Sequence, residues 1–416
     1  MKDRLEKAIT FTGAALSLAL YGCFIRRGLR TPPPGEDQDV SGDLPVELHE
    51  FPTADGVTLR VKRYAKPGGT PVLLCHGFGG CGSSFDLPRE DRNLAVFLAR
   101  QGLDVWVSSW RGCGREPYAS GCGDWTHTID DLAVYDAVAL VDGVAGATGG
   151  KVVWVGHSMG GHILYMYLQG VRFEGGRVVS DPGLVRSHHR KLLGGVTLGS
   201  PPGFAYRRGE PYHTAFKSAT GTALLGFMNR QMLRKEVTSP RIPCPADAVD
   251  FLEGHPRLAM ALSRSPFASL TYCRRNTDKD ATTSLVKWGT GPASAGMYVQ
   301  LLSSVLEERF REHPGRGEPG ELYDYTAGMA LVELPIMFLT GTEDFANPRT
   351  IRRLGYEAVS SPVKEYVNLE GYGHTDLLMG KGAAAEVYPR INAWIRSLEG
   401  RPPPAPGAIH RRDCPC

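Results

Sequence analysis

The sequence predicts an α/β fold with a mostly parallel central sheet, and three observations support this prediction. Up to Ser200, short apolar runs alternate with amphipathic stretches of helical period. The motif Gly156–Gly160 (GHSMG) stands where one apolar run passes into a helical stretch. The alternation stops after Ser200 and resumes at Leu334, which indicates one α/β domain interrupted by an insertion.

The elements expected from this pattern follow in chain order. Val46–Phe51 and Val57–Tyr64 alternate apolar and polar residues around an Ala-Asp-Gly turn, which predicts a β-hairpin. Further strands are expected at Pro71–Cys75, Asp104–Trp110, Lys151–Val155, Leu192–Leu198, Leu334–Leu339 and Lys364–Leu369. Helices are expected at Asp91–Arg100, Ile129–Val141, Met159–Leu168, from Pro348 onward and at Ala383–Leu398. Strands that alternate with helices predict a parallel sheet buried on both faces.

The same pattern divides the chain into segments. Residues 46–200 and 333–399 form the predicted α/β core, and residues 201–332 form an insertion with a helix expected at Gly296–Phe310. Residues 31–45 read as a proline-rich acidic linker, and the proline-rich tail at 400–416 is expected to be disordered.

Residues 1–30 contain an apolar segment, Ala8–Ile25, of 18 residues without a charge. As a helix it would span about 27 Å, close to the thickness of a hydrocarbon core. Three interpretations stay open: a membrane anchor, a signal peptide, or an apolar helix that docks on the domain. The segment therefore predicts a membrane-associated or exported protein through residues 8–25, and otherwise a cytoplasmic one.

Composition excludes some classes of function. The net charge of +3 over 416 residues leaves no basic stripe, so nucleic acid is not an expected partner. The nine cysteines show no Cys-x-x-Cys spacing, which argues against a zinc site. Cys113 and Cys122 share a glycine-rich loop and are close enough in sequence to form a disulfide, a question that the sequence leaves open.

The strand–turn–helix context of Gly156–Gly160 predicts a nucleophile elbow with Ser158 at its tip. The small residues Gly156 and Gly160 let the chain turn sharply enough to present the hydroxyl at a helix N-terminus. A serine hydroxyl becomes reactive only when a base takes its proton. His374 is the candidate base, because it lies in a loop after the last predicted strand and the base follows nucleophile and acid in such folds.

The acid that orients the base should follow the penultimate strand, where Glu343 and Asp344 stand. Its carboxylate would accept the second ring N–H of His374 and stabilise the imidazolium. Asp376 is a weaker candidate, because a residue so close to His374 in sequence is expected to shape the loop.

The oxyanion of the reaction needs backbone donors. The N–H of Met159 follows the nucleophile directly, and the N–H of Phe78 lies in a glycine-rich turn after the first parallel strand. His76, Gly77 and His157 flank these donors and are predicted to contact the substrate.

Taken together, these residues resemble the α/β-hydrolase superfamily and, within it, the acid lipase family of gastric and lysosomal lipases. The resemblance runs with gaps from about Leu73 to Ile395. The similar stretches are His76–Phe78, Asp104–Gly112, Gly156–Gly160, Tyr323–Tyr325, Gly341–Pro348 and His374–Gly380.

The resemblance implies an α/β-hydrolase fold with a largely helical cap over the sheet. It also implies a carboxylic ester hydrolase that works through an acyl-enzyme, with the triad Ser158, Asp344 and His374. In that register Asp344 is preferred to Glu343. No metal or organic cofactor would be required, and the partner would be a small-molecule or lipid-like ester.

Other functions remain compatible with the same residues. Acyl transfer to an alcohol or thiol uses the same triad, and a peptidase is not excluded. A non-catalytic binding module on this fold is a further alternative, although such modules usually lose a triad member. Haloalkane dehalogenases and epoxide hydrolases on this fold need an aspartate nucleophile, so Ser158 argues against these two classes.

Overall fold

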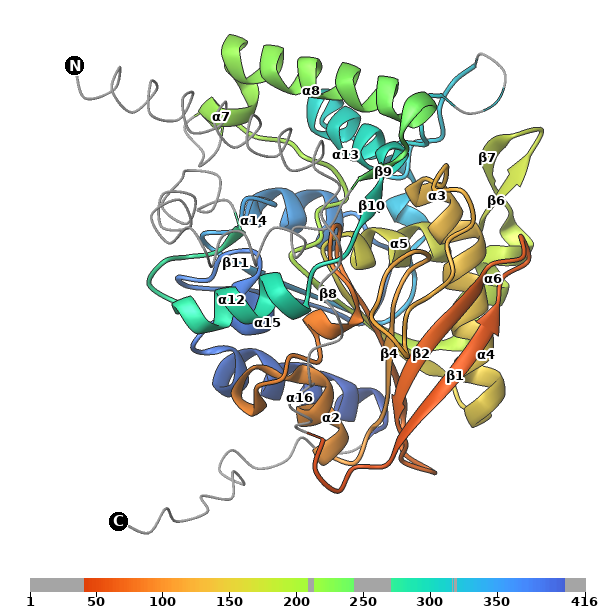
Figure 1. The fold of residues 1–416 in the computed structure, drawn as a ribbon, viewed down its shortest axis with the longest axis vertical. Helices are drawn as coiled ribbons and strands as arrows, with labels where there is room; N and C mark the ends of the chain where they lie inside the picture. Colours follow the sequence, from red (N-terminus) through yellow and green to blue (C-terminus); the bar gives the residue numbers. More distant parts are fainter. Residues whose placement is uncertain (1–40, 209–212, 243–270, 316, 318–319, 401–416) are drawn as a thin grey trace.

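The computed structural model describes residues 41–208, 213–242, 271–315, 317 and 320–400, and its centre is an eight-stranded sheet (Figure 1). The strands lie in the order β1-β2-β4-β3-β5-β8-β11-β12. Their bounds are β1 Val46–Pro52, β2 Thr58–Tyr64, β4 Asp104–Ser108, β3 Pro71–Cys75, β5 Val152–His157, β8 Leu192–Leu198, β11 Ile336–Gly341 and β12 Lys364–Leu369.

Most of this sheet is parallel, as predicted. The five pairings from β4 across to β12 are parallel, whereas β1 and β2 form the expected antiparallel hairpin and β2 joins β4 antiparallel. The hairpin register pairs Val46 with Tyr64. Its turn places Gly56 at φ +88°, a conformation that favours glycine.

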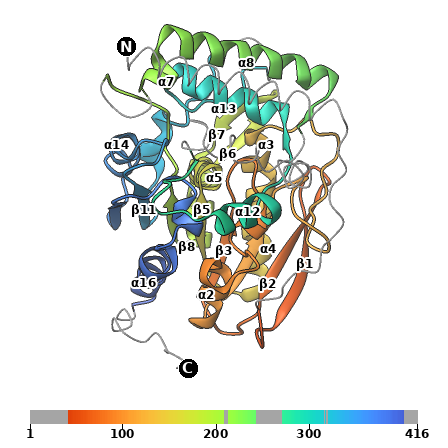
Figure 2. The same cartoon turned by 60° about the vertical axis from the view of Figure 1, so that its left-hand side comes forward.

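Helices cover both faces of the sheet and bury two apolar layers (Figures 1 and 2). On one face lie α4 (Ala137–Thr148) and α5 (Met159–Leu168), and on the other lie α2 (Leu94–Arg100) and α16 (Tyr388–Leu398). Alternate residues of β3 belong to the two layers: Leu73 packs in one and Val72 in the other. Burial on both faces explains why β3 is a continuous apolar run.

Some element boundaries differ from the expected ones for local reasons. The strand expected to reach Trp110 ends at Ser108, and the Trp110 backbone N–H instead donates to the His76 ring. The helix expected from Asp91 begins at Leu94, because the Asn93 side chain caps it by accepting the Val96 N–H at 2.8 Å.

Three elements between α5 and β8 are not predicted by the apolar pattern. They are the hairpin β6 (Val171–Glu174) and β7 (Arg177–Ser180), followed by α6 (Pro182–Lys191). The local signals are the Gly175-Gly176 turn and Asp181, whose side chain caps α6 by accepting the Gly183 N–H at 2.7 Å.

The described parts of the insertion are mostly helical and cover the carboxyl ends of the parallel strands (Figure 2). They comprise α7 (His213–Lys217), α8 (Ala219–Thr238), α12 (Lys279–Trp288), α13 (Ala295–Glu307) and the two-stranded β9 (Arg241–Ile242) and β10 (Ala293–Ser294). Gln300 of α13 donates to the buried Asp130 carboxylate at 2.6 Å and so fixes this helix to the core.

Several expectations fall outside the described residues. The structure does not describe the apolar segment Ala8–Ile25, most of the linker or nearly all of the tail. Membrane association and localisation therefore stay predictions. Within the ranges that are described, no helix has both the length and the apolar character needed to cross a membrane.

Cys113 and Cys122 are not joined by a disulfide in the structure. The Cys113 thiol donates to the Pro292 carbonyl at 3.3 Å, and the Cys122 sulfur lies 3.9 Å from His127 Nδ1.

A buried ion pair connects the loop after β4 to the rest of the core. The Arg111 guanidinium is 4% exposed and donates to Asp136 Oδ1 at 2.6 Å and to Asp55 Oδ2 at 2.6 Å. Asp136 is fully buried, and this burial raises the pKa of its carboxyl to about 6. The positive charge of Arg111 therefore offsets the free-energy cost of burying this carboxylate.

We expect Arg111→Leu to lower the free energy of unfolding by about 3–5 kcal/mol, because it leaves Asp136 buried without its partner. Urea denaturation measures the effect. The matched control is Arg352→Leu, whose partner Glu357 is half exposed. The control should change stability by less than about 1 kcal/mol. Equal losses in both variants would contradict this role of Arg111.

Candidate active site

Ser158 lies between β5 and α5 with a strained backbone. Its φ of +52° and ψ of −118° place it in a region that non-glycine residues rarely occupy. Such a conformation costs about 1–3 kcal/mol and persists only where surrounding contacts impose it. The Ser158 N–H donates to the Leu198 carbonyl of β8 at 2.8 Å, which fixes the turn to the neighbouring strand.

The two glycines of the motif permit this turn. A Cβ at Gly156 would lie 2.5 Å from the Gly160 carbonyl oxygen, and a Cβ at Gly160 would lie 2.1 Å from the Cys75 carbonyl oxygen. No side chain fits at either distance, so the start of α5 can approach the ends of β3 and β5 only with glycine. The predicted strand–turn–helix context is present.

His374 and Asp344 meet at the same edge of the sheet. Asp344 follows β11 and His374 follows β12, and His374 Nδ1 lies 2.9 Å from Asp344 Oδ1. The two residues are 6% and 1% exposed. Glu343, the sequence alternative to Asp344, is exposed.

The Asp344 carboxylate has few other partners. Oδ1 also accepts the Ala346 N–H at 2.8 Å, and Oδ2 is buried with no hydrogen-bond partner among the described residues. The His374 ring is therefore one of two hydrogen-bond partners of this carboxylate among the described residues, which is the arrangement expected of the acid that orients the base.

Gly199 is a site residue that the sequence pattern did not indicate. It directly follows β8, has φ +59°, and a Cβ there would lie 2.6 Å from Asp344 Oδ2 and 3.0 Å from His374 Nδ1. The available signal was a glycine at the carboxyl end of a buried strand, next to the expected acid and base.

The expected oxyanion donors lie close to the nucleophile. Gly77 approaches Ser158 so closely that a Cβ at Gly77 would lie 2.9 Å from Ser158 Cβ. Within the described part of the chain, neither the Phe78 N–H nor the Met159 N–H has a backbone hydrogen-bond acceptor. Met159 begins α5, so the helix dipole reinforces its N–H as a donor to an anion.

His76 holds the glycine-rich turn that carries Phe78 through both nitrogens of its ring. Its Nε2 accepts the Trp110 N–H at 3.1 Å, which leaves Nδ1 to donate to the Gly77 carbonyl at 2.9 Å. Burial lowers the pKa of the His76 ring to about 4, so the ring stays neutral at physiological pH.

His157 packs against the base. Its Nε2 lies 3.1 Å from the His374 carbonyl oxygen, and the two rings lie 4.7 Å apart between centroids. Burial lowers the pKa of His157 to about 3, so the neutral ring donates to that carbonyl. The substrate contacts expected for His76, Gly77 and His157 stay predictions, and the observed contacts of the two rings are with the protein itself.

The loop at His374 is shaped by Asp376, as expected for this weaker candidate. Asp376 Oδ2 accepts the Gly373 N–H at 2.8 Å, so its carboxylate is directed to the backbone beside the base.

Among the described residues, no hydrogen bond joins the Ser158 hydroxyl to the His374 ring.

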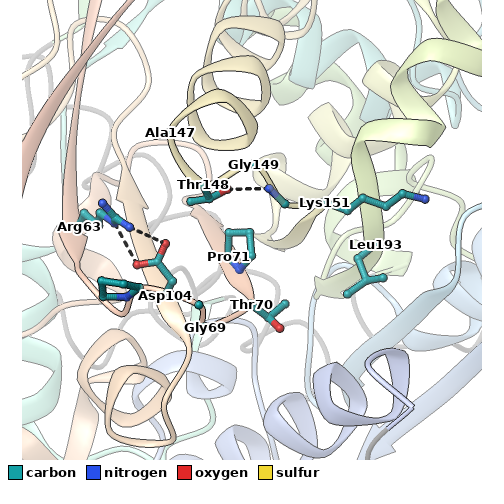
Figure 3. A pocket seen from close by; sticks show the side chains of 13 residues that line it. Arg63, Gly69, Thr70, Pro71, Asp104, Ala147, Thr148, Gly149, Lys151 and Leu193 are labelled. Atoms are coloured by element: carbon teal, nitrogen blue, oxygen red, sulfur yellow. Dashed lines mark hydrogen bonds and ion pairs between the residues drawn. The ribbon is translucent and has the colours of Figure 1, made fainter.

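An open groove of about 670 Å³ lies at the amino ends of the parallel strands, and Figure 3 shows the side chains that line it. Pro71 and Asp104, which begin β3 and β4, line it together with Lys151, which precedes β5. Asp104 is already paired with Arg63 at 2.9 Å. Because Ser158, Asp344 and His374 stand at the carboxyl ends of the strands, this groove is not the active site.

The fold and this arrangement of serine, histidine and aspartate define a hydrolase of the α/β class. The chain belongs to the alpha/beta hydrolase family, which matches residues 72–388.

Its curated relatives include several lipases. The chain is 24% identical over 375 residues to triacylglycerol lipase 1 of Arabidopsis thaliana, covering 84% of this chain and 86% of that protein. Triacylglycerol lipase 2 of the same plant is 38% identical over 129 residues, which cover 27% of this chain and only 31% of that protein. Human gastric triacylglycerol lipase is 35% identical over 130 residues, covering 28% and 33%. The predicted resemblance to lipases is confirmed, and these relatives support ester hydrolysis in general.

Solved structures show the same fold. The monoglyceride lipase of Saccharomyces cerevisiae aligns with a TM-score of 0.52 at 15% identity, covering 88% of this chain and 99% of that chain. The monoacylglycerol lipase of Paleococcus ferrophilus aligns with a TM-score of 0.50 at 16% identity, covering 85% and 100%.

We expect Gly199→Ala to lower kcat by about 10- to 100-fold on an ester substrate, because the added methyl group displaces the Asp344–His374 pair. Steady-state kinetics measure the loss. Gly149→Ala is the matched control, since Gly149 also has a positive φ, of +68°, but no atom within 4 Å of its Cβ position. A kcat for Gly199→Ala equal to that of the control would show that Gly199 does not protect the pair.

Proposed function

We propose that this protein hydrolyses carboxylic esters through an acyl-enzyme formed on Ser158. The observation that carries the proposal is the buried bond of 2.9 Å between His374 Nδ1 and Asp344 Oδ1, at the sheet edge where the strained Ser158 stands. The relatives that act as lipases support the class of substrate.

In the first half of the reaction, His374 Nε2 accepts the Ser158 proton while Oγ attacks the ester carbonyl carbon. Asp344 holds the ring in the tautomer that leaves Nε2 unprotonated and stabilises the imidazolium that forms. The tetrahedral intermediate collapses, the C–O bond to the alcohol breaks, and His374 returns the proton to the leaving oxygen.

In the second half, water attacks the acyl-enzyme. His374 takes a proton from the water, a second tetrahedral intermediate forms, and its collapse releases the carboxylic acid and restores the Ser158 hydroxyl. In both halves the negative oxygen is proposed to bind the N–H groups of Phe78 and Met159. Losing one such donor typically costs about 3–4 kcal/mol of transition-state stabilisation.

We expect Ser158→Ala to lower kcat on p-nitrophenyl butyrate by about 10⁶-fold. Asp344→Asn should lower it by about 10⁴-fold, because the amide favours the wrong tautomer of His374. Release of p-nitrophenol measures both. Ser397→Ala is the control, since its hydroxyl only donates to the Trp394 carbonyl of α16. Substantial activity in purified Ser158→Ala would refute the assigned nucleophile.

A lipid-like ester is the substrate that the surroundings of the site favour. Three partly exposed aromatic residues, Phe78, Tyr298 and Phe345, lie near the proposed catalytic groups. The ring centroid of Phe345 lies 4.6 Å from that of His374, and the ring centroids of Phe78 and Tyr298 lie 4.5 Å apart.

The outer side of α8 also supports contact with a lipid surface. Phe227, Leu233 and Val237 are 49%, 40% and 87% exposed there, and the exposed basic residues Arg230 and Arg234 lie among them. Apolar and basic side chains on one helix face are typical of segments that contact anionic lipid surfaces.

We expect kcat/KM for p-nitrophenyl decanoate to exceed that for the acetate ester by at least about tenfold, since each buried methylene contributes about 0.8 kcal/mol. Both esters are compared below the concentration at which the longer one forms micelles, so that aggregation does not imitate specificity. A preference for acetate would contradict a lipid-like substrate.

A further inference from the structure

We propose that residues 271–291 of the insertion, here called the strap, fix the distance between the base loop (371–375) and the oxyanion turn (76–80). Within the strap, we assign Thr277 as a positioning residue for His374. The inference rests on the proposed ester hydrolysis and adds a catalytic task for the insertion, which lies outside the α/β core.

The first end of the strap binds the base loop through one buried carboxylate. Asp376 is 0% exposed and lies two residues after His374. Its Oδ1 accepts the Thr277 hydroxyl, and its Oδ2 accepts the Cys273 N–H at 2.7 Å as well as the Gly373 N–H of the base loop. One side chain thus joins the strap to the residue that precedes the base.

Backbone contacts reinforce this end. The Thr375 N–H donates to the Thr271 carbonyl at 2.7 Å, and the Lys381 N–H donates to the Asn276 carbonyl at 2.6 Å. A Cβ at Gly373 would lie 2.6 Å from the Cys273 backbone nitrogen. The strap and the base loop are therefore in direct backbone contact.

The second end of the strap binds the oxyanion turn. The Gly291 N–H donates to the Gly79 carbonyl at 2.9 Å, and the Cys81 N–H donates to the Gly289 carbonyl at 3.0 Å. Gly80 and Thr290 form an antiparallel bridge between these two bonds. A Cβ at Gly291 would lie 2.6 Å from the Gly80 carbonyl oxygen, so this junction is as close as the first.

The helix α12 connects the two ends and rests on both partners. Its Ala281 forms a buried cluster with Leu87, which follows the oxyanion turn, and with Met379, which ends the short helix after His374. All three side chains are 0% exposed. A helix cannot stretch without breaking its hydrogen bonds, so α12 acts as a spacer between the base loop and the oxyanion turn.

This spacing matters because the base and the oxyanion donors must serve one tetrahedral intermediate at the same time. A misplacement of about 1 Å can cost about 100-fold in rate. Loss of the Thr277 hydroxyl would leave Asp376 Oδ1 without that donor and release the base loop, while the substrate pocket itself keeps its residues. The expected signature is a lower kcat with an unchanged KM.

The experiment compares Thr277→Val with Thr282→Val in the full chain. Both changes replace a hydroxyl by a methyl group on the strap, but the hydrogen bond of the Thr282 hydroxyl is local: it donates to the carbonyl of Asp278, the residue that caps α12, at 3.0 Å. The readouts are kcat and KM on p-nitrophenyl butyrate, the rate constant for labelling by a fluorophosphonate, and Tm.

We expect Thr277→Val to lower kcat and the labelling rate constant by about 10- to 100-fold with KM changed less than about twofold. Thr282→Val should match the wild type in both rates, and Thr277→Ser, which keeps the hydroxyl, should restore them. Gly291→Ala changes the other end of the strap and should lower kcat by the same factor. If Thr277→Val does not fold, the kcat of Gly291→Ala tests whether the strap positions the two loops.

Wild-type kcat per labelled serine in folded Thr277→Val, with or without a lower Tm, would overturn the positioning role. So would wild-type kcat in Gly291→Ala. A wild-type protein that neither hydrolyses the ester nor reacts with the fluorophosphonate would instead refute the proposed function itself, and the strap's catalytic task with it.

Discussion

The close packing of α5 against the end of β3 is the contact on which the rest of the site depends. Only glycine fits at Gly160, because a Cβ there would lie 2.1 Å from the Cys75 carbonyl oxygen. At this approach Ser158 has its strained φ of +52°, and Met159, whose N–H is an expected oxyanion donor, begins α5 directly after it. The oxyanion turn continues directly from Cys75, so one contact positions the nucleophile and both expected oxyanion donors.

The acid and the base reach the same place through sheet register. β11 and β12 are parallel with Gly341 opposite Leu369, so the loops that follow them leave the sheet at the same level. The Glu343 N–H donates to the Tyr372 carbonyl at 3.0 Å. This bond joins the two loops just ahead of Asp344 and His374 in the sequence. The insertion then adds the strap, which relates this pair of loops to the oxyanion turn across the site.

Local sequence signals predicted the parallel sheet, the elbow, the base at His374 and an acid at Glu343 or Asp344, because these follow from strand order and from glycines at fixed offsets. The choice of Asp344 came from the resemblance to the lipases. The local signals did not predict Gly199 or Thr277. The importance of each depends on a partner more than 90 residues away, Asp344 for Gly199 and Asp376 for Thr277, which only the fold brings close. The β6–β7 hairpin was missed because its strands are too short to show an apolar period.

The most direct test of the central claim is covalent labelling of the full chain in detergent with a fluorophosphonate, read by intact mass, beside the Ser158→Ala variant. The reagent reacts with a serine whose hydroxyl a neighbouring base has activated. The account predicts one adduct per wild-type chain, located on Ser158, and none on the variant. An unlabelled wild-type chain that is folded, or an adduct that persists in Ser158→Ala, would contradict it.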